Sequence, residues 1–292
     1  MAFPIITNAL TVDVEDYFQV SAFDDYVRRS EWSTMPLRVE RNTRALLDLF
    51  DHAGAKCTFF VLGWIAERCP QLVREIDNRG HEVASHGYSH TLVYKQSRET
   101  FYEETRRSKD VLEDTIGKSV DGYRAASYSI TPESLWALDV LAEVGFTYDS
   151  SVFPIHHDRY GIPDAERQPH LMSLSGGKRL AEFPISTWRL LGQNIPIAGG
   201  GYFRIFPYTL TSYGLGQINS REKMPFVFYL HPWEIDSEQP RIQCGRLSRF
   251  RHYTNLHRTE LRLRRLLGKF RFATMREILT ERNLIEAEGI PA

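Results

Sequence analysis

The stretch KCTFFVLGWIAERCPQLVREIDNRGHEVASH, residues 56–86, decides the fold. Its two apolar runs, residues 56–63 and 81–86, are typical of short buried strands, and the segment between Pro70 and Gly80 has the pattern of an amphipathic helix. Proline suits the first turn of a helix, and glycine suits its end. Two buried strands joined by a helix predict parallel pairing in one sheet.

The same alternation of strand and helix continues on both sides of this unit. The further predicted elements are a strand at 6–14, a helix at 38–54, a helix at 97–117, a strand at 120–126, a helix at 131–145 with Thr131 as its N-cap, and a strand at 225–231. Repeated units of this kind indicate an α/β fold with a parallel sheet or barrel, whose functional site lies at the carboxyl ends of the strands.

The second half of the chain is less regular. Residues 150–201 are rich in proline and glycine, which indicates an elaborated loop region rather than an independent domain. Residues 246–272 combine a helical apolar stripe with many arginines, which predicts a helix with a basic face. That face is either simply solvated or binds an anion or a membrane surface. We expect residues 1–292 to form one domain.

Composition narrows the class of protein. A formal net charge of −1 gives no general attraction to nucleic acid. The three cysteines, Cys57, Cys69 and Cys244, form no Cys-x-x-Cys pair, which argues against a disulfide framework and suits a reducing compartment. The first residues lack the basic start of a signal peptide, and no apolar run is long enough to span a membrane. We therefore expect a cytoplasmic protein.

Two histidines four residues apart, His86 and His90, are the first candidates for metal binding. This spacing can bring both imidazoles to one metal, although in a chain with ten histidines it also occurs among ordinary capping or surface residues. The acidic residues Asp13, Glu15 and Asp16 follow the first predicted strand. Carboxylates crowded at the end of a buried strand are costly unless paired or bound to a metal, and the alternative is a helix cap or a solvated loop.

Arg124 and His231 each stand at the end of a predicted strand. A guanidinium can hold a carboxylate in one orientation through paired hydrogen bonds, or it can form an ordinary salt bridge. A histidine at the end of an apolar strand is more often a core residue than a catalyst. Among the nearby aromatic residues, Tyr128 and Trp233 are the candidates for substrate contact, with packing in the core as the alternative.

Taken in order, these motifs resemble those of the NodB-type polysaccharide deacetylases, also called carbohydrate esterase family 4. The acidic motif after the first strand, His-x-x-x-His after the third, Arg-x-x-x-Tyr after the fourth and Leu-His at a late strand carry the resemblance. It covers about residues 5–150 and the segment around His231. GHEVASHGYSH, residues 80–90, is its most specific part.

Two further runs resemble one branch of this family more narrowly. LTVDVEDYFQVSAF, residues 10–23, and GFTYDSSVFPI, residues 145–155, are similar to deacetylases found with exopolysaccharide gene clusters and the exosortase system. In that branch the segment from about residue 150 onward is a characteristic C-terminal extension. The resemblance thus implies that residues 150–292 include this extension of a single deacetylase domain.

The resemblance implies a distorted (β/α)7 barrel that binds one divalent metal, usually zinc, with cobalt, nickel or iron as alternatives. Carried onto this chain, the ligands would be His86 and His90 together with Asp16, or with Glu15 in its place. The choice arises because the family's commonest form has two adjacent aspartates, a base and then a ligand, where this chain has Asp13-Val14-Glu15-Asp16.

The resemblance also implies catalytic roles. Asp13 would be the base that takes a proton from the attacking water, and Arg124 would orient it. The backbone N–H groups near Ser127 and Tyr128 would help to stabilise the oxyanion. His231, held by a nearby acidic group, would protonate the leaving amine.

The implied activity is metal-dependent removal of an acetyl group from an N-acetylated sugar of a polysaccharide or a lipid-linked exopolysaccharide precursor. One alternative is a hydrolase or deformylase acting on a small or lipid-linked amide, and another is a non-catalytic carbohydrate-binding protein on the same barrel. The presence of every motif residue disfavours the last. The expected partner is a carbohydrate, with a membrane surface or a lipid-linked sugar as a further contact for the basic residues 246–272.

Overall fold

A curled, mostly parallel sheet runs through the computed structural model, which describes residues 6–157 and 159–286. The strands are β1 (Thr7–Val14), β2 (Thr58–Val61), β3 (Glu82–Ser85), β4 (Gly122–Tyr123), β5 (Tyr148–Asp149), β6 (His170–Ser173), β7 (Arg179–Glu182), β8 (Thr187–Leu190), β9 (Gln193–Pro196), β10 (Val227–Leu230) and β11 (Arg271–Ala273). Strands β10-β1-β2-β3-β4-β5-β7 pair in parallel in this order, β6 follows β7 antiparallel, and β11 pairs with β1.

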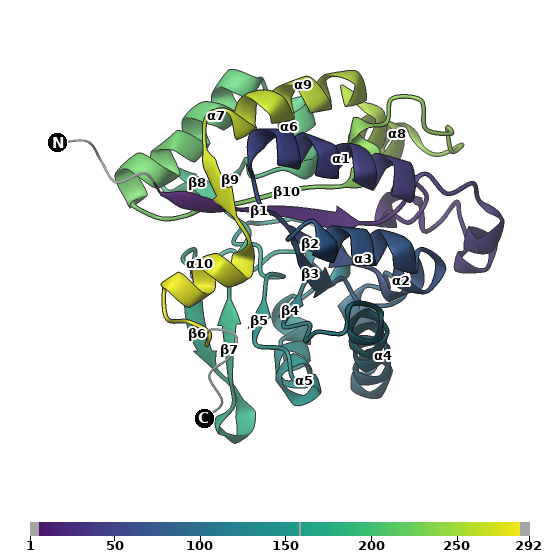
Figure 1. Ribbon diagram of the computed structural model, residues 1–292. Coiled ribbons are helices and arrows are strands. Elements are labelled where there is room, and N and C mark those ends of the chain that lie inside the picture. Colours follow the sequence, from purple (N-terminus) through teal and green to yellow (C-terminus); the bar gives the residue numbers. More distant parts are fainter. Residues whose placement is uncertain (1–5, 158, 287–292) are drawn as a thin grey trace.

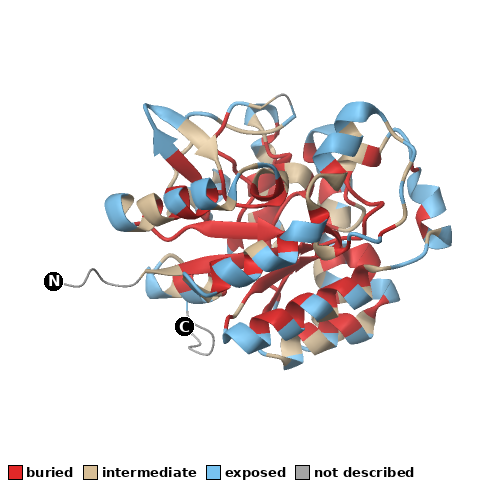
Figure 2. Cartoon of the chain, turned by 90° about the horizontal axis from the view of Figure 1, so that it is seen from above, coloured by how far each residue is buried: buried red, intermediate tan, exposed pale blue. Residues whose placement is uncertain are grey.

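Helices pack on both sides of this curl, most of them on its outer side and the last one, Met275–Glu281, with the residues of the concave side (Figure 1). They are α1 (Val39–Ala53), α2 (Gly63–Arg68), α3 (Pro70–Asn78), α4 (Arg98–Ile116), α5 (Trp136–Val144), α6 (Gly200–Ile205), α7 (Tyr208–Gln217), α8 (Arg246–Tyr253), α9 (Leu256–Leu267) and α10 (Met275–Glu281). Helix α1 packs against α9, and α4 packs against α3 and α5. Figure 2 shows that buried residues gather along the sheet and on the helix faces turned toward it.

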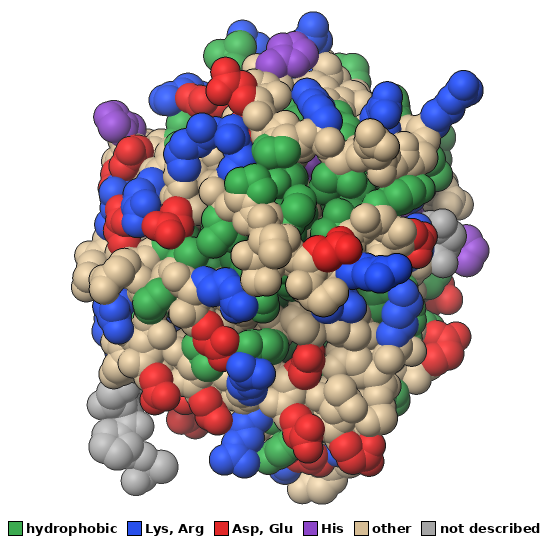
Figure 3. Space-filling model, turned by 90° about the vertical axis from the view of Figure 1, so that its right-hand side faces the viewer, with side chains coloured by type: hydrophobic (Ala, Val, Ile, Leu, Met, Phe, Trp, Pro, Cys, Tyr) green, Lys and Arg blue, Asp and Glu red, His purple; other side chains and the backbone are tan. Residues whose placement is uncertain are grey.

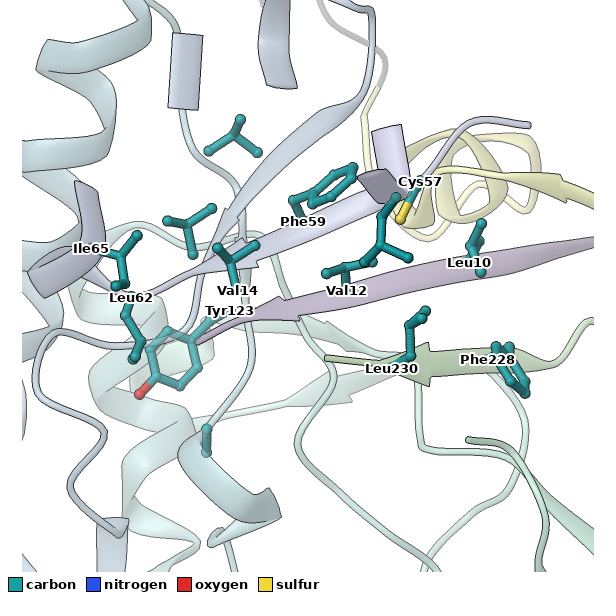
Figure 4. Packing of buried hydrophobic residues seen from close by; sticks show 14 of the residues in the cluster. Leu10, Val12, Val14, Cys57, Phe59, Leu62, Ile65, Tyr123, Phe228 and Leu230 are labelled. Carbon is teal, nitrogen blue, oxygen red and sulfur yellow. The ribbon is translucent and has the colours of Figure 1, made fainter. Parts of the chain in front are cut away.

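Alternate side chains of β1 face opposite sides of the sheet, as the pleat of a strand requires. Leu10, Val12 and Val14 belong to the large hydrophobic cluster between the sheet and its helices. Figure 4 shows them near Phe59 of β2 and Leu230 of β10, which belong to the same cluster. This burial of apolar surface is the main stabilising contribution on the outer side of the curl.

The residues between them face the concave side. Ala9 belongs to a second, smaller hydrophobic cluster, and Thr11 and Asp13 both accept hydrogen bonds from Arg124. One strand therefore supplies apolar residues to the core on one side and polar residues to the interior of the half-barrel on the other.

The predicted order of strands and helices is confirmed, and so is the distorted barrel of parallel strands. Within the described residues no pairing joins β10 to β6, so the barrel stays open as a half-barrel. Helices α1 and α4 end as predicted, because Gly54 (φ 62°) and Gly117 (φ 70°) adopt the left-handed conformation. The helix expected at 131–145 instead begins as a 3-10 turn, Pro132–Ser134, although Thr131 caps it as expected.

The single helix expected at 246–272 is a further correction. The chain forms two helices, α8 and α9, separated by Thr254 and by Asn255 in the left-handed conformation (φ 56°). The buried Arg204 explains the break, because its guanidinium donates to the carbonyl oxygens of His252 and Thr254. A long-range contact, absent from the local sequence pattern, thus divides the helix.

The region expected to be irregular, residues 150–201, contains two antiparallel hairpins, β6–β7 and β8–β9. Strand β7 pairs with β5, and the later strands β10 and β11 pair with β1, so both halves of the chain contribute to one sheet. Among the described helices, none combines the length and the hydrophobicity needed to cross a membrane.

Candidate active site

One pocket of about 400 Å³ lies where the strands of the half-barrel end. Figure 3 looks onto this side of the molecule and shows hydrophobic side chains gathered in the middle of the face, with both basic and acidic side chains around them. The residues predicted from the sequence that line this pocket are Asp13, Glu15, His86, His90, Tyr128, His231 and Trp233. Loops that follow β1, β3, β4 and β10 carry most of them, as expected for a parallel sheet.

Glu15, His86 and His90 form a buried group that could hold a metal. Each offers one ligand atom, and these atoms lie within 4.8 Å of one another. His86 Nδ1 lies 2.8 Å from the carbonyl oxygen of Arg124, which leaves Nε2 as its ligand atom. Burial lowers the pKa of His86 to about 4, so the ring is neutral near pH 7 and has a lone pair to offer.

Unsatisfied polar atoms in this group support the same interpretation. Glu15 Oε2 lies 2.8 Å from His90 Nε2, and His90 Nδ1 is buried without a hydrogen-bond partner among the described residues. Burial raises the pKa of Glu15, but the charges of His90 and His231 outweigh this effect and lower the pKa to about 2. Two imidazoles and one carboxylate are a donor set that suits zinc and similar transition metals, so these residues fit the expected metal.

The structure corrects the position expected for Asp16. Its Oδ1 accepts a hydrogen bond from the N–H of Tyr17 at 2.8 Å, and its Oδ2 accepts from the N–H groups of Arg38 and Val39 at 2.7 and 2.9 Å. The carboxylate therefore caps the start of α1 and is not part of the histidine group. Glu15, the alternative ligand, lies with His86 and His90 instead.

Asp13 and Arg124 form a buried ion pair at the edge of this group. Arg124 Nη1 donates to Asp13 Oδ1 at 2.7 Å and to Thr11 Oγ1 at 2.8 Å. On its other side the guanidinium donates to the hydroxyl and the carbonyl oxygen of Ser150, at 3.0 and 3.2 Å. Arg124 is thus held from both sides, and it fixes the orientation of the Asp13 carboxylate.

His231 faces the same carboxylates across the pocket. Its Nε2 lies 3.5 Å from Glu15 Oε1 and 3.9 Å from Asp13 Oδ2, while its Nδ1 lies 2.7 Å from Glu234 Oε1. Burial lowers the pKa of His231, but the charges of Glu15 and Glu234 and the hydrogen bond to Glu234 outweigh this effect and raise the pKa to about 9. The ring therefore carries a proton at neutral pH.

Glu234 is itself fixed by a buried arginine. Arg204 Nε donates to Glu234 Oε2 at 2.6 Å, and both side chains are buried. Burial raises the pKa of Glu234, but Arg204 and His231 outweigh this effect and lower it. The sequence of contacts from Arg204 through Glu234 to His231 orients the imidazole toward the pocket.

The two predicted substrate-contact residues both line the pocket but differ in their surroundings. The hydroxyl of Tyr128 is buried without a hydrogen-bond partner among the described residues. Trp233 stacks between His231 and His252, and its indole N–H donates to Glu15 Oε1 at 3.2 Å. Tyr128 thus has a free polar group to offer a ligand, whereas Trp233 has its own N–H engaged and mainly supports the two neighbouring side chains.

Backbone strain also gathers at this pocket. Three non-glycine residues that line it adopt left-handed conformations: His90 (φ 54°), Ser127 (φ 51°) and Tyr128 (φ 55°). Such conformations are costly and persist where surrounding contacts hold them. The N–H of Tyr128 donates to the carbonyl oxygen of Ala125, which removes it from the pair of N–H groups expected to meet an oxyanion.

Several residues of the site were not predicted from the sequence. Glu234 had a local signal, since it lies three residues after His231 in the run HPWE. Ser150 lies in the run YDSS, which the sequence analysis used only for its similarity to one branch of the deacetylases and to which it gave no role in the site. Arg204 and Thr11 had no signal, because their contacts with Glu234 and Arg124 join segments far apart in the chain.

Comparison with known proteins shows what each half of the chain is similar to. Residues 18–148 match the family model "Polysaccharide deacetylase", and residues 150–280 match "Domain of unknown function (DUF3473)". The peptidoglycan-N-acetylglucosamine deacetylase of Bacillus cereus is 32% identical over 75 residues, which are 26% of this chain and 27% of that protein. The peptidoglycan deacetylase of Helicobacter pylori is 30% identical over 113 residues, 39% of this chain and 37% of that protein.

These matches support the polysaccharide deacetylase family for the first half of the chain, while the matched segments span 27% and 37% of the two curated relatives. Among solved structures, a putative polysaccharide deacetylase from Mycobacterium smegmatis is similar over 100% of this chain and 96% of its own, with a TM-score of 0.63 and 18% identity. That similarity extends the shared fold over both halves of the chain.

Proposed function

We propose that this chain is a metal-dependent hydrolase that removes an acetyl group from an N-acetylated sugar of a polysaccharide or of a lipid-linked exopolysaccharide precursor. The observation that carries the proposal is a single pocket in which the group of Glu15, His86 and His90 lies opposite His231 and beside Asp13. The names of the deacetylase relatives support the reaction class.

Glu15, His86 and His90 would hold the metal, for which zinc is the first candidate. When bound, a divalent metal supplies a Lewis acid that polarises a carbonyl oxygen and lowers the pKa of a water molecule. Three protein ligands leave further coordination positions open, as a catalytic site requires.

Asp13 would act as the general base. The Arg124 guanidinium occupies its Oδ1, so Oδ2 is the oxygen left to take a proton from the water that attacks the acetyl carbonyl. Thr11 and Ser150 hold the guanidinium in place and thereby hold the carboxylate in one orientation. Proton transfer from the water needs this fixed geometry.

His231 would act as the general acid. Its Nδ1 is held by Glu234, so Nε2 is the atom that presents a proton to the pocket. As the carbon–nitrogen bond of the amide breaks, this proton goes to the leaving nitrogen, and the products are acetate and a free amino sugar.

Acetate release from N-acetylglucosamine oligomers tests the proposal. We would assay the protein as purified, after chelation, and after zinc is restored, and compare His86→Ala with the exposed control His257→Ala. The proposal expects activity that follows the metal, is lost in His86→Ala and is retained in His257→Ala.

Each other outcome points elsewhere. If zinc binds but no acetate is released from any acetylated sugar, formamide substrates come next, because the same site suits hydrolysis of another amide. If sugars bind without turnover of any amide, the chain is a carbohydrate-binding protein. If no metal binds, metal dependence is excluded.

A further inference from the structure

The mouth of the pocket differs in chemistry from its floor. The carboxylates and histidines described above form the floor, whereas Tyr160, Tyr202 and Tyr229 contribute to aromatic walls. Two arginines, Arg159 and Arg251, also line the pocket, and both are exposed to solvent. These two residues lie 92 positions apart, in segments that both follow the deacetylase-like half of the chain.

The described residues around Arg159 pack against one another. Tyr160 stacks on Phe153 with the rings 4° from parallel and on His157 with the rings 10° from parallel. The N–H of Ile162 donates to the carbonyl oxygen of Phe153 at 2.9 Å, which closes the loop. Arg159 therefore lies next to a tyrosine that is held by ring stacking.

The backbone of Arg251 contacts Arg204, the residue whose ion pair with Glu234 helps to position His231. The Arg251 carbonyl oxygen accepts a hydrogen bond from Arg204 Nη2 at 2.8 Å, and Arg204 is the residue that pairs with Glu234. Arg251 lines the same pocket as Tyr160 and Tyr202. Helix α8 thus presents Arg251 to the same aromatic wall.

Neither guanidinium is neutralised by a neighbour in the described structure. No ion pair joins Arg159 or Arg251 to a carboxylate of the described residues, whereas the third lining arginine, Arg204, is paired. Asp13 and Glu15 are the acidic residues among the described lining residues, and both are engaged on the floor. Among the described residues, the mouth therefore carries two positive charges with no counter-charge.

We propose that this mouth is an anion subsite, in which Arg159 and Arg251 bind an oxyanion, a carboxylate or a phosphate, carried by the substrate next to its acetylated sugar. Guanidinium groups form charge-assisted hydrogen bonds with both kinds of oxyanion, and partial exclusion of water in a pocket strengthens them. The aromatic wall between floor and mouth holds the sugar ring. This inference rests on the proposed function, since it names the substrate class for the same pocket.

Calorimetric binding of matched sugars to the zinc-loaded protein tests the subsite without requiring turnover. The probes are N-acetylglucosamine, N-acetylglucosamine 1-phosphate and a disaccharide of N-acetylglucosamine with glucuronate. We expect at least one charged probe to bind about tenfold or more tightly than the neutral sugar, as one or two charge-assisted hydrogen bonds would give. A preference for the phosphate indicates a phosphate-linked precursor, and a preference for the uronate indicates an acidic polymer.

Variants separate the arginines from the metal as the source of this preference. In Arg159→Gln/Arg251→Gln the difference between charged and neutral probes should shrink to about twofold or less. The control Arg249→Gln, an exposed arginine of α8 that does not line the pocket, should keep the difference.

Equal binding of charged and neutral sugars overturns the subsite, and so does a preference that survives in the double variant, which would place the anion on the metal. Absence of acetate release from all three sugars would instead count against the proposed function, because the binding comparison does not depend on turnover.

Discussion

The Arg124 guanidinium lies 2.7 Å from the Asp13 carboxylate, and both side chains are buried. This pair joins the proposed catalytic base to the core of the half-barrel, because the same guanidinium also contacts Thr11 of β1 and Ser150 after β5. Breaking a buried pair by removing one partner leaves the other charge without compensation, which is costly.

Arg124→Met should therefore lower the free energy of unfolding by about 3–5 kcal/mol. Removing both charges in Asp13→Asn/Arg124→Met should restore part of this loss, since no buried charge is then left alone. Urea denaturation followed by circular dichroism measures both values. The exposed pair Arg98–Glu143 serves as the control, and Arg98→Met should cost less than about 1 kcal/mol. Equal losses in Arg124→Met and Arg98→Met would contradict the structural role of the buried pair.

Glu15→Ala and Asp16→Ala should separate two neighbouring carboxylates with different roles. Glu15→Ala should weaken zinc binding by more than ~100-fold. Loss of a residue that only hydrogen-bonds to a metal ligand typically costs ~10–100-fold, and loss of a ligand should cost more. Asp16→Ala should keep the zinc affinity but lower the free energy of unfolding by about 1–2 kcal/mol, because it removes the cap of α1. Competition with a chromophoric chelator gives the affinities. A larger loss of zinc affinity in Asp16→Ala would return Asp16 to the ligand set.

The contrast between these two residues shows how far the sequence alone could predict the site. The motif residues could be found, because each stands where a strand ends. The choice between Glu15 and Asp16 required the tertiary structure, because both residues follow the end of β1 at Val14 and only their contacts separate them. The partnership of Arg204 with Glu234 also required the tertiary structure.

Some elements of the fold could likewise be predicted from the sequence, and others could not. Helices with local end signals, such as Gly54 after α1, were predictable because those signals act within a few residues. The division of residues 246–272 into two helices was not, since it depends on hydrogen bonds donated by Arg204, which lies more than forty positions earlier. Hairpins β6–β7 and β8–β9 also escaped prediction, because their strands are short and partly exposed.

His231→Asn should test the general acid. We expect kcat for an N-acetyl sugar to fall by about 10²–10⁴-fold, with zinc affinity retained, because the leaving amine loses its proton donor. With a nitrophenyl acetate, whose leaving group departs without a proton, the loss should be less than about tenfold. The exposed His257→Asn is the control for both substrates. Equal losses on amide and ester would indicate that His231 has a structural or binding role instead.

His81 should make the stability of the protein depend on pH. This residue is buried, its ring contacts Phe50 and Phe59, and neither ring nitrogen has a hydrogen-bond partner among the described residues. Burial, together with the charge of Lys56, lowers its pKa to about 4 from an ordinary value of 6.5. Between these two values the unfolded chain binds a proton that the folded chain does not bind, so the free energy of unfolding falls as the pH falls.

The contribution of His81 should lower the free energy of unfolding by about 2 kcal/mol between pH 7 and pH 5. His81→Phe, which suits the surrounding rings, and His81→Leu should both remove this part of the pH dependence, whatever their effect on stability at pH 7. Urea denaturation at pH 7, 6 and 5 gives the slope for each variant, and the exposed His52→Gln should keep the slope of the parent protein. A parent-like slope in both His81 variants would show that His81 binds a proton equally in the folded and unfolded chains, and the acid sensitivity would then arise from the other buried histidines.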